Sequence, residues 1–529
     1  MLLSDRFPIS LSLACATIAG ALAAWLGFAP IGWWWVPYLS FAVLATLLQR
    51  APSVKFGAVI GFVFGLGYFL AGVSWVRVSL GDFGGMPLPM AWFAAFLFCS
   101  VLAAFPLLAG AFTAWVKPKN SWFFAFVFAC AWTFAEYLRA HVFTGFEWLS
   151  VGTSQSGGEV SFQPFIPLVG SFGVTLLTVV TAGVIARAIA PIDDSRAKNS
   201  QGLQLSGFQK AWRASSALEA AVYLVVVGGV ANWLLFSWTP SEPAGRPLRV
   251  SLLQGNVPQS MKWEPEKFVQ TLQMYERLIT QAKGELIILP ETALPAPLSR
   301  IPSDYIERLR GIAFSKGANL LIGVPVQEQG KFYNAAVSLG VEDLQQYRKV
   351  HLVPFGEYMP LRGLLAWFYA NLTIPMSDFS PGDAAQAPIK INGQTLGISI
   401  CYEDTFARDV HRTLPDATLL VNMSNDAWFG KSAAAEQHLQ LSQMRAIEQA
   451  RPMLRSNNTG ITAVIDEKGR VTQRLEPFTE GILETTVQGR KGATPYMMWG
   501  DLPVLLMCLA GLGIGMAQRL RRRAGQEAS

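Results

Sequence analysis

The chain has 529 residues and a formal net charge of +6, and 51% of its residues are hydrophobic whereas only 15% are charged. An average soluble domain contains about 25% charged residues, so this composition argues against a purely soluble protein. Much of the positive charge lies in short segments beside apolar runs, which indicates control of membrane topology rather than binding of a nucleic acid.

Charged residues are distributed unevenly along the chain. Roughly 20 of them lie before residue 238 and about 52 lie between 238 and 495, where their density approaches that of a globular domain. We expect eight apolar spans, each long enough to cross about 30 Å of hydrocarbon. They lie near 9–27, 31–49, 56–76, 89–115, 121–138, 165–186, 216–237 and 499–518. The sequence therefore predicts a bundle of seven helices over 1–237, a polar domain over 238–495, and an eighth helix with a basic tail over 496–529.

Lysine and arginine collect in alternate connections between the predicted spans, and such connections face the cytoplasm. The remaining short connections offer little positive charge beyond Arg77 and Arg139. We therefore expect both termini in the cytoplasm and the polar domain on the opposite side, which in a bacterium is the periplasmic side of the inner membrane. The positive residues are Arg6, Arg50, Lys55, Lys117, Lys119, Arg196, Lys198, Lys210, Arg213, Arg519, Arg521, Arg522 and Arg523.

Two local features of the membrane region bear on its packing. The connection 77–87, which contains glycines and a proline, is interpreted as plain turn chemistry. Glu136 and Arg139 lie three residues apart at the end of the fifth span and so share a helix face. They either neutralise each other or contact lipid headgroups, because ionisable groups at membrane depth are costly.

The polar domain alternates short strand-like runs with helical patterns, which predicts a layered α/β domain. Most of the strand-like runs are continuously apolar, as strands covered on both faces are. Helices are predicted over 264–283 and 434–450. Strands are predicted over 248–254, 285–289, 319–324, 335–339, 395–401, 418–423 and 460–465.

Three polar residues of distinct chemistry lie at or just past the ends of such runs. Glu291 follows Leu286-Ile-Ile-Leu-Pro, Lys349 follows Tyr347-Arg, and Cys401 follows Gly397-Ile-Ser-Ile. Strand ends of layered α/β folds converge on one cleft, so a carboxylate, an ammonium and a thiol are expected to meet there. Taken singly, each has a simpler explanation: core packing for the cysteine, a solvated turn for the glutamate and a surface position for the lysine.

The chemistry predicted for this set is nucleophilic acyl transfer. Glu291 accepts the proton of the Cys401 thiol, because the thiolate is the competent nucleophile. Lys349 stabilises the thiolate and then the oxyanion of the tetrahedral intermediate, together with a backbone N–H such as that of Tyr402. The intermediate that results is a thioester on Cys401.

In these residues the chain resembles the nitrilase superfamily, whose Glu-Lys-Cys triad occurs in this chain order. With its predicted spans, it resembles the membrane-bound apolipoprotein N-acyltransferase family over essentially the whole chain. Many members have proline where this chain has Glu147, a difference that concerns the shape of one loop. The matching motifs are Gln254-Gly-Asn-Val-Pro-Gln259 with Lys262 and Trp263, Pro290-Glu-Thr292, Lys349 through Phe355-Gly-Glu-Tyr-Met-Pro360, Cys401-Tyr-Glu403 and Asn422-Met-Ser-Asn-Asp-Ala-Trp-Phe-Gly430.

The resemblance implies a nitrilase-like αββα sandwich and a ping-pong reaction. Cys401 would take the sn-1 acyl chain of a phospholipid, typically phosphatidylethanolamine, and pass it to the α-amine of the diacylglyceryl-cysteine of an apolipoprotein. The same resemblance implies that Glu357, Tyr402 and Glu403 support the site and that Trp263 lines the lipid-entry side. A monomer without a cofactor is expected. A catalytic metal is not expected, because the histidines and cysteines lack paired ligand spacing.

Segment 360–376 is too apolar for an ordinary surface loop. It is interpreted either as a lid that dips into the outer leaflet or as a segment that packs on the helix bundle.

Two other functions remain open at this point. A membrane-tethered nitrilase-type hydrolase would pass through the same thioester and use water as the acceptor. A transporter or scaffold with a periplasmic binding module would need charged or broken helices within the spans, and the sequence has little of either beyond Glu136.

Overall fold

The computed structural model describes residues 8–157, 162–189, 206–238, 240–259, 265–359 and 378–527. The chain divides into two compact units. The helical unit comprises Met1–Ser74, Ala95–Trp238 and Trp499–Ser529. The sheet unit comprises Thr239–Met498 and also Trp75–Ala94, a segment that lies among the apolar helices in the sequence.

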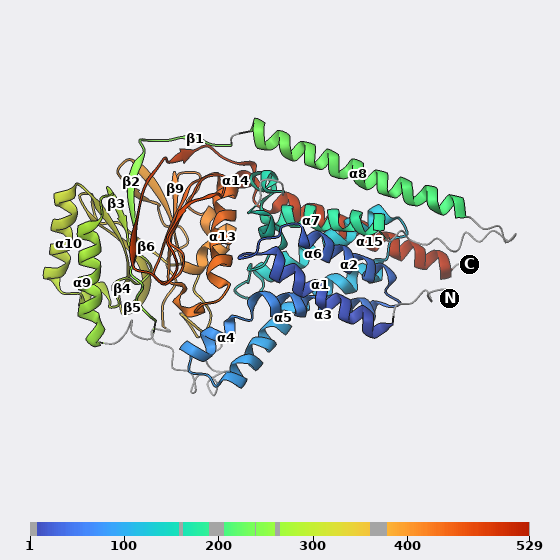
Figure 1. Cartoon of the computed structure of the whole chain (residues 1–529), viewed down its shortest axis with the longest axis horizontal. Helices are drawn as coiled ribbons and strands as arrows, with labels where there is room; N and C mark the ends of the chain where they lie inside the picture. The colour runs from blue at the N-terminus through green and yellow to red at the C-terminus, as the bar shows by residue number, and fades with distance from the viewer. Residues whose placement is uncertain are drawn as a thin grey trace. The chain divides into compact units, whose positions relative to one another are not determined.

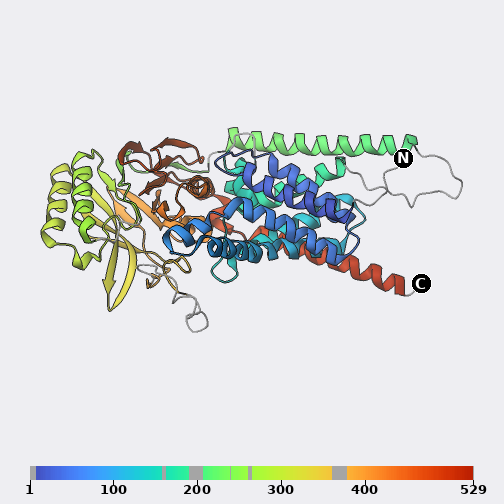
Figure 2. The same ribbon diagram turned by 60° about the horizontal axis from the view of Figure 1, so that its bottom comes forward.

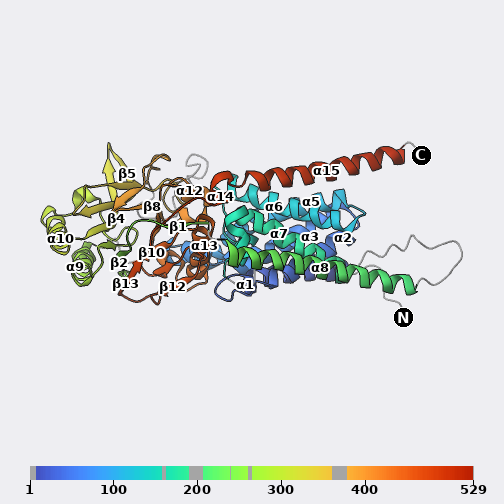
Figure 3. The ribbon, with the colours of Figure 1, turned by 90° about the horizontal axis from the view of Figure 1, so that it is seen from above.

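Long helices that run alongside one another make up the helical unit (Figures 2 and 3). They are α1 Ile9–Gly27, α2 Val36–Arg50, α3 Val54–Val73, most of α5 Leu88–Val116, α6 Ser121–His141, α7 Ile166–Ile189, α8 Ser206–Ser237 and α15 Leu502–Glu527. Helices α1 and α3 approach closely at glycines: a Cβ on Gly20 would lie 2.0 Å from the carbonyl oxygen of Phe64, and one on Gly67 would lie 2.3 Å from that of Thr17. Such small-residue contacts are typical of packed membrane helices.

Six helices among the described residues are long and apolar enough to cross a membrane, so the predicted multi-pass helical region is present, whereas the predicted count of eight is not confirmed. The second predicted span corresponds to α2, a helix of only 15 residues that begins at Val36 with Pro37 in its first turn, and several residues before Val36 form turns. The seventh contains a shorter apolar stretch, Leu218–Ala231. The six are α1, α3, α5, α6, α15 and the stretch Gln163–Ile189.

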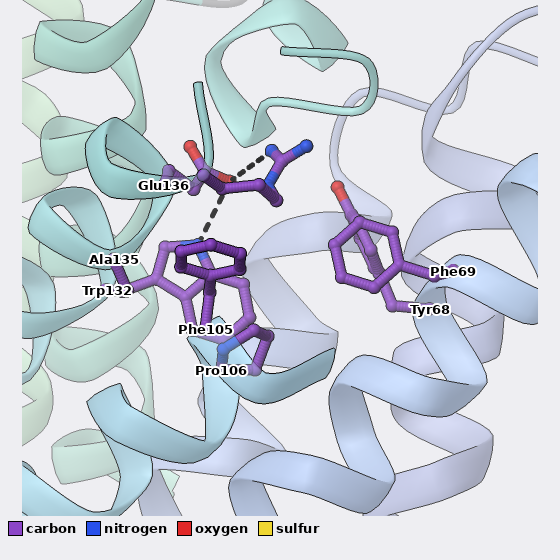
Figure 4. A pocket seen from close by; sticks show the side chains of 8 residues that line it. Tyr68, Phe69, Phe105, Pro106, Trp132, Ala135 and Glu136 are labelled. Carbon is purple, nitrogen blue, oxygen red and sulfur yellow. Dashed lines mark hydrogen bonds and ion pairs between the residues drawn. The ribbon is translucent and has the colours of Figure 1, made fainter. Parts of the chain in front are cut away.

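Glu136 and Arg139 are both buried inside the helical unit. Figure 4 shows Glu136 above Trp132, whose indole Nε1 donates to the Glu136 carboxylate at 3.1 Å. Arg139 Nη2 lies 4.0 Å from that carboxylate, and Arg139 Nη1 donates to the carbonyl oxygens of Phe146 and Trp148, each at 2.6 Å. These inward contacts favour the mutually neutralising pair over contact with lipid headgroups.

Two six-stranded sheets form the centre of the sheet unit. The first has the order β13-β2-β3-β4-β5-β6, in which β2, β3 and β4 are parallel. Its strands are β2 Leu248–Gln254, β3 Leu286–Ile288, β4 Asn319–Glu328, β5 Lys331–Gly340, β6 Gln346–Arg348 and β13 Gly481–Val487. The second has the order β12-β11-β10-β9-β8-β7, in which β8, β9 and β10 are parallel. Its strands are β7 Ile389–Ile391, β8 Gln394–Ile400, β9 Leu419–Ser424, β10 Met453–Asn457, β11 Ala463–Ile465 and β12 Val471–Arg474.

The two sheets face each other across an apolar core that includes Leu252, Ile288, Ile398 and Val421. Helices α9 Pro265–Gln281 and α10 Ser303–Lys316 cover the outer face of the first sheet, and α13 Ala434–Gln449 covers that of the second (Figure 1). This four-layer arrangement agrees with the predicted αββα sandwich. Each predicted strand is present, and the two predicted helices match α9 and α13 to within a few residues.

Five strands of the two sheets, β6, β7, β10, β12 and β13, were not predicted, and neither was α10. The connection 77–87 is also more ordered than the plain turn expected. It contains α4 Val76–Val78 and a π-helical turn, η1 Ser79–Phe83, and it packs on the sheet unit. The Ser79 hydroxyl donates to the carbonyl oxygen of Trp428 at 2.8 Å, and the Trp75 indole donates to Gln437 at 3.1 Å.

Candidate active site

Glu291 follows β3 at its carboxyl end, as the sequence predicts, and only 7% of it is exposed. The next residue, Thr292, has φ +43°, so the chain turns sharply after the carboxylate. Strand β4 passes directly behind this turn at Gly323, where a Cβ would lie 2.2 Å from the carbonyl oxygen of Pro290 and 2.8 Å from the Cα of Glu291. The position of Glu291 therefore depends on the absence of a side chain at Gly323.

Lys349 follows β6 and is 1% exposed. Its Nζ lies 2.8 Å from Glu357 Oε2 and 3.5 Å from Glu291 Oε1. Burial lowers the pKa of this ammonium, but the carboxylates of Glu357 and Glu291 outweigh burial and raise the pKa above its ordinary value. Lys349 is therefore a permanent cation, which can donate hydrogen bonds but cannot accept a proton.

Cys401 is the first residue after β8 and begins the turn η5 Cys401–Thr405. It has φ +53° and is 9% exposed. A residue other than glycine is therefore held in the left-handed backbone conformation at the end of a strand. Such strained positions concentrate at active sites because the surrounding structure holds them there. Burial and the negative charge of Glu291 raise the pKa of the Cys401 thiol, whereas Lys349 lowers it. At rest, the sulfur therefore carries its proton.

Asn334 completes this group and was not predicted from the sequence. Its Nδ2 donates to Glu291 Oε1 at 2.7 Å and to Glu357 Oε1 at 2.9 Å, so a single amide on β5 holds both carboxylates. The backbone N–H of Lys349 donates to the backbone carbonyl oxygen of Asn334 at 2.8 Å. The only signal in the sequence is an asparagine directly before an apolar strand run.

Glu403 and Tyr402 lie in the same turn as Cys401. Glu403 is fully buried and accepts hydrogen bonds from the backbone N–H groups of Val350 and Ile400, each at 2.7 Å, which joins the Lys349 strand end to the Cys401 strand end. Burial raises the pKa of Glu403 to about 7.

The Tyr402 ring packs edge-on against Phe406, with ring centroids 5.0 Å apart. His351 Nδ1 lies 2.7 Å from Asp409 Oδ2.

Trp263 and segment 360–376 lie outside the described residues, so their expected roles at the lipid-entry side and as a lid remain predictions.

The geometry restricts which residue can do which step. Lys349 cannot act as a base, because it stays charged, and Cys401 cannot attack without losing its proton. Two carboxylates lie beside Lys349, those of Glu357 and Glu291, and of these two the Glu291 carboxylate also raises the pKa of the Cys401 thiol. A buried ammonium such as that of Lys349 can stabilise negative charge that develops beside it.

Comparison with known proteins places both parts of the chain. Residues 249–496 match the family model described as Carbon-nitrogen hydrolase, and residues 20–184 match the one described as Apolipoprotein N-acyltransferase N-terminal domain. The chain is 41% identical over 499 residues to an apolipoprotein N-acyltransferase of Nitrosomonas europaea, which covers 94% of this chain and 95% of the relative.

Two further relatives carry the same name. The protein of Methylococcus capsulatus is 39% identical over 518 residues, with 96% of this chain and 97% of the relative covered. That of Chromobacterium violaceum is 38% identical over 521 residues, with coverage of 97% and 95%. Together with the apolar helices, these relatives indicate a bacterial membrane protein. The match over nearly the full length shows that this chain belongs to the apolipoprotein N-acyltransferase family.

Proposed function

We propose that this chain transfers an acyl chain from a phospholipid to the α-amine of the N-terminal diacylglyceryl-cysteine of an apolipoprotein, through a thioester on Cys401. This reaction is the final step of bacterial lipoprotein maturation. The donor is the sn-1 ester of a phospholipid such as phosphatidylethanolamine, and no cofactor takes part.

The first half-reaction is acylation of Cys401. Glu291 accepts the thiol proton as the sulfur forms a bond to the ester carbonyl carbon, and Lys349 donates to the oxyanion. The tetrahedral intermediate then loses its C–O bond, and the proton on Glu291 passes to the departing alkoxide, which leaves as a lysophospholipid. In the second half-reaction the acceptor amine forms the C–N bond and gives up one proton to Glu291, the C–S bond breaks, and that proton returns to the sulfur.

The other residues act through these three. Glu357 and Asn334 fix Lys349 and Glu291, because each contacts at least one of them directly. Glu403 fixes the Cys401 turn, and Tyr402 supplies a backbone N–H toward the oxyanion. We further assign Trp263 to the lipid-entry side of the site.

We also propose the topology that the sequence favours. The chain crosses the bacterial inner membrane eight times as a monomer, with both termini in the cytoplasm and the catalytic domain in the periplasm. The boundaries are 1–237 for the first seven helices, 238–495 for the catalytic domain, and 496–529 for the last helix and its basic tail. The positive charge of alternate connections supports this orientation.

One observation carries the proposal: Lys349 lies buried with its Nζ 3.5 Å from Glu291 Oε1, and the charges of both residues shift the pKa of the Cys401 thiol. Cys401 itself lies at a strained strand end. The test is intact-mass spectrometry of the full chain incubated with phosphatidylethanolamine alone. We expect a hydroxylamine-labile fatty-acyl adduct on Cys401 that is absent in Glu291→Gln. A clean spectrum from the parent chain with a competent donor would overturn the proposal.

The hydrolase alternative differs only in the acceptor. Membership of an N-acyltransferase family disfavours it. A diacylated acceptor peptide should consume the acyl adduct far faster than water does. Equal release of free fatty acid with and without the peptide would instead identify a hydrolase. A non-enzymatic transporter or scaffold would keep its function in Cys401→Ser, where we expect acyl transfer to be lost.

A further inference from the structure

Four charged side chains are buried together behind the Cys401 turn. They are Asp404 of η5, Asp426 of the 3₁₀ turn η6 Asp426–Phe429, His438 of α13 and Arg455 of β10, and we call them the quartet. At most 2% of each residue is exposed. Isolated charges at such depth are costly, so their arrangement needs a reason.

The two cations of the quartet each contact both carboxylates. His438 Nε2 lies 2.7 Å from Asp404 Oδ1, and its Nδ1 lies 2.9 Å from Asp426 Oδ1. Arg455 donates to Asp426 Oδ2 at 2.9 Å and to Asp404 Oδ2 at 3.3 Å. Because both ring nitrogens of His438 face carboxylate oxygens, the doubly protonated imidazolium satisfies both contacts. Two positive and two negative charges therefore cancel.

The charge state of His438 follows from its neighbours. Burial and Arg455, whose Nη2 lies 2.8 Å from His438 Nδ1, both oppose a charged imidazole. Asp404 and Asp426 outweigh them and raise the pKa of His438 to about 9. The Ser442 hydroxyl, which is uncharged, donates to Asp404.

The quartet connects to the nucleophile through Asn422. Its Nδ2 donates to the carbonyl oxygen of Cys401 at 3.1 Å, while its Oδ1 accepts from Arg455 at 2.9 Å. Asp404 belongs to the same turn as Cys401, and Asp426 is among the charges that raise the pKa of the thiol, after burial and Glu291. The quartet thus touches the nucleophile turn by its backbone and acts on the sulfur by its charge.

We propose that the quartet holds the Cys401 turn in its strained conformation and keeps the net charge near the sulfur at zero, so that its four members are positioning residues for acyl transfer. This inference rests on the proposed function, because it takes Cys401 as the nucleophile. Loss of His438 leaves one net negative charge near the sulfur, which opposes the thiolate. Loss of the Asp404 charge leaves one net positive charge, which favours it. Opposite signs are not expected if the quartet serves folding alone.

The experiment measures alkylation of Cys401 by iodoacetamide as a function of pH. The full chain is used in detergent micelles, and the Cys401 peptide is quantified by mass spectrometry, since the other cysteines lie in helices of the helical unit. His438→Gln should raise the pH midpoint of alkylation by about one unit, which slows the reaction about tenfold at a fixed lower pH. Asp404→Asn should lower the midpoint by a similar amount. The double variant, in which the charges balance again, should return to within about half a unit of the parent.

A matched control lies on the same helix. Glu448→Gln breaks a fully buried ion pair with Arg445, whose Nε lies 3.2 Å from Glu448 Oε2, without changing the quartet. It should lower thermal stability and leave the midpoint unchanged. If His438→Gln fails to fold, Asp404→Asn alone decides: a midpoint lowered by about one unit supports the proposal, and a midpoint equal to that of the parent overturns it.

Shifts of the same sign in both single variants, or no shift in either, would also overturn the proposal. The failure of the proposed function is distinguishable, because alkylation does not require acyl transfer. If the two single variants shift the alkylation midpoint in opposite directions but the parent chain forms no acyl adduct, the lipid reaction is rejected and the role of the quartet stands.

Discussion

Gly323→Ala should inactivate the enzyme although it adds one methyl group outside the reacting residues. The added Cβ would lie 2.2 Å from the carbonyl oxygen of Pro290 and 2.8 Å from the Cα of Glu291. Both atoms belong to the backbone, so relief requires the Glu291 turn to move. Overpacking of this kind costs about 1–3 kcal/mol of stability. A displacement of about 1 Å at a catalytic group lowers its rate about 100-fold.

The assay is the rate of acyl-adduct formation on Cys401 with phosphatidylethanolamine, measured beside the thermal midpoint of unfolding. Gly311→Ala is the matched control, because nothing lies within 4 Å of a Cβ at that exposed position on α10. It should keep the parental rate and gain about 0.5–1 kcal/mol from helix propensity. A Gly323→Ala protein that folds and acylates within threefold of the parent would refute the dependence of Glu291 on this glycine.

Three further changes test other contacts. Asn334→Leu leaves Glu291 without its amide donor and should slow adduct formation about 10- to 100-fold, with a stability loss of about 1–3 kcal/mol; an unchanged rate would contradict this. Ser79→Ala removes the hydrogen bond to the carbonyl oxygen of Trp428, which is worth about 1 kcal/mol. It should increase hydrogen exchange across residues 426–430 about fivefold. Exchange equal to that of the parent would show that this hydrogen bond contributes nothing. The pKa of His438 is raised to about 9, so its contribution to stability is complete below its ordinary pKa of about 6.5 and is lost as the pH rises through 9. The thermal midpoint should fall over that range in the parent and stay flatter in His438→Gln, and a parent with no fall would contradict the assignment.

How much of the sandwich is predictable depends on what its strands bury. Strands such as β2 and β9 bury apolar residues on both faces, so their sequences indicate their structure directly. Strand β10 is equally buried but carries Arg455 and Asn457, which resemble surface residues in a sequence. Both side chains donate to Asp426, which lies on the turn η6 rather than on a neighbouring strand. A buried polar strand is therefore invisible until its partners are known.

The same limit applies to the candidate site. Glu291 and Cys401 are predictable as strand-end residues because each follows a continuously apolar run, whereas Lys349 follows β6, a short strand of mostly polar residues that was not predicted. Asn334 lies inside the paired stretch of β5, where it is opposite Pro325 of β4. Its contact with Glu291 depends on the register of that pairing and on the side of the sheet that its side chain faces, neither of which a single sequence specifies.

The raised pKa of the Cys401 thiol bears directly on how this site works. A resting thiolate would react with oxidants, because susceptibility to oxidation follows thiolate character. Burial and Glu291 instead raise the pKa of the Cys401 thiol, which favours the protonated sulfur at rest. The neighbouring carboxylates raise the pKa of Lys349, so in the proposed reaction the counter-charge for the oxyanion needs no reorganisation. In the proposed reaction, the carboxylate that suppresses the thiolate at rest, Glu291, is also the group that accepts its proton during attack.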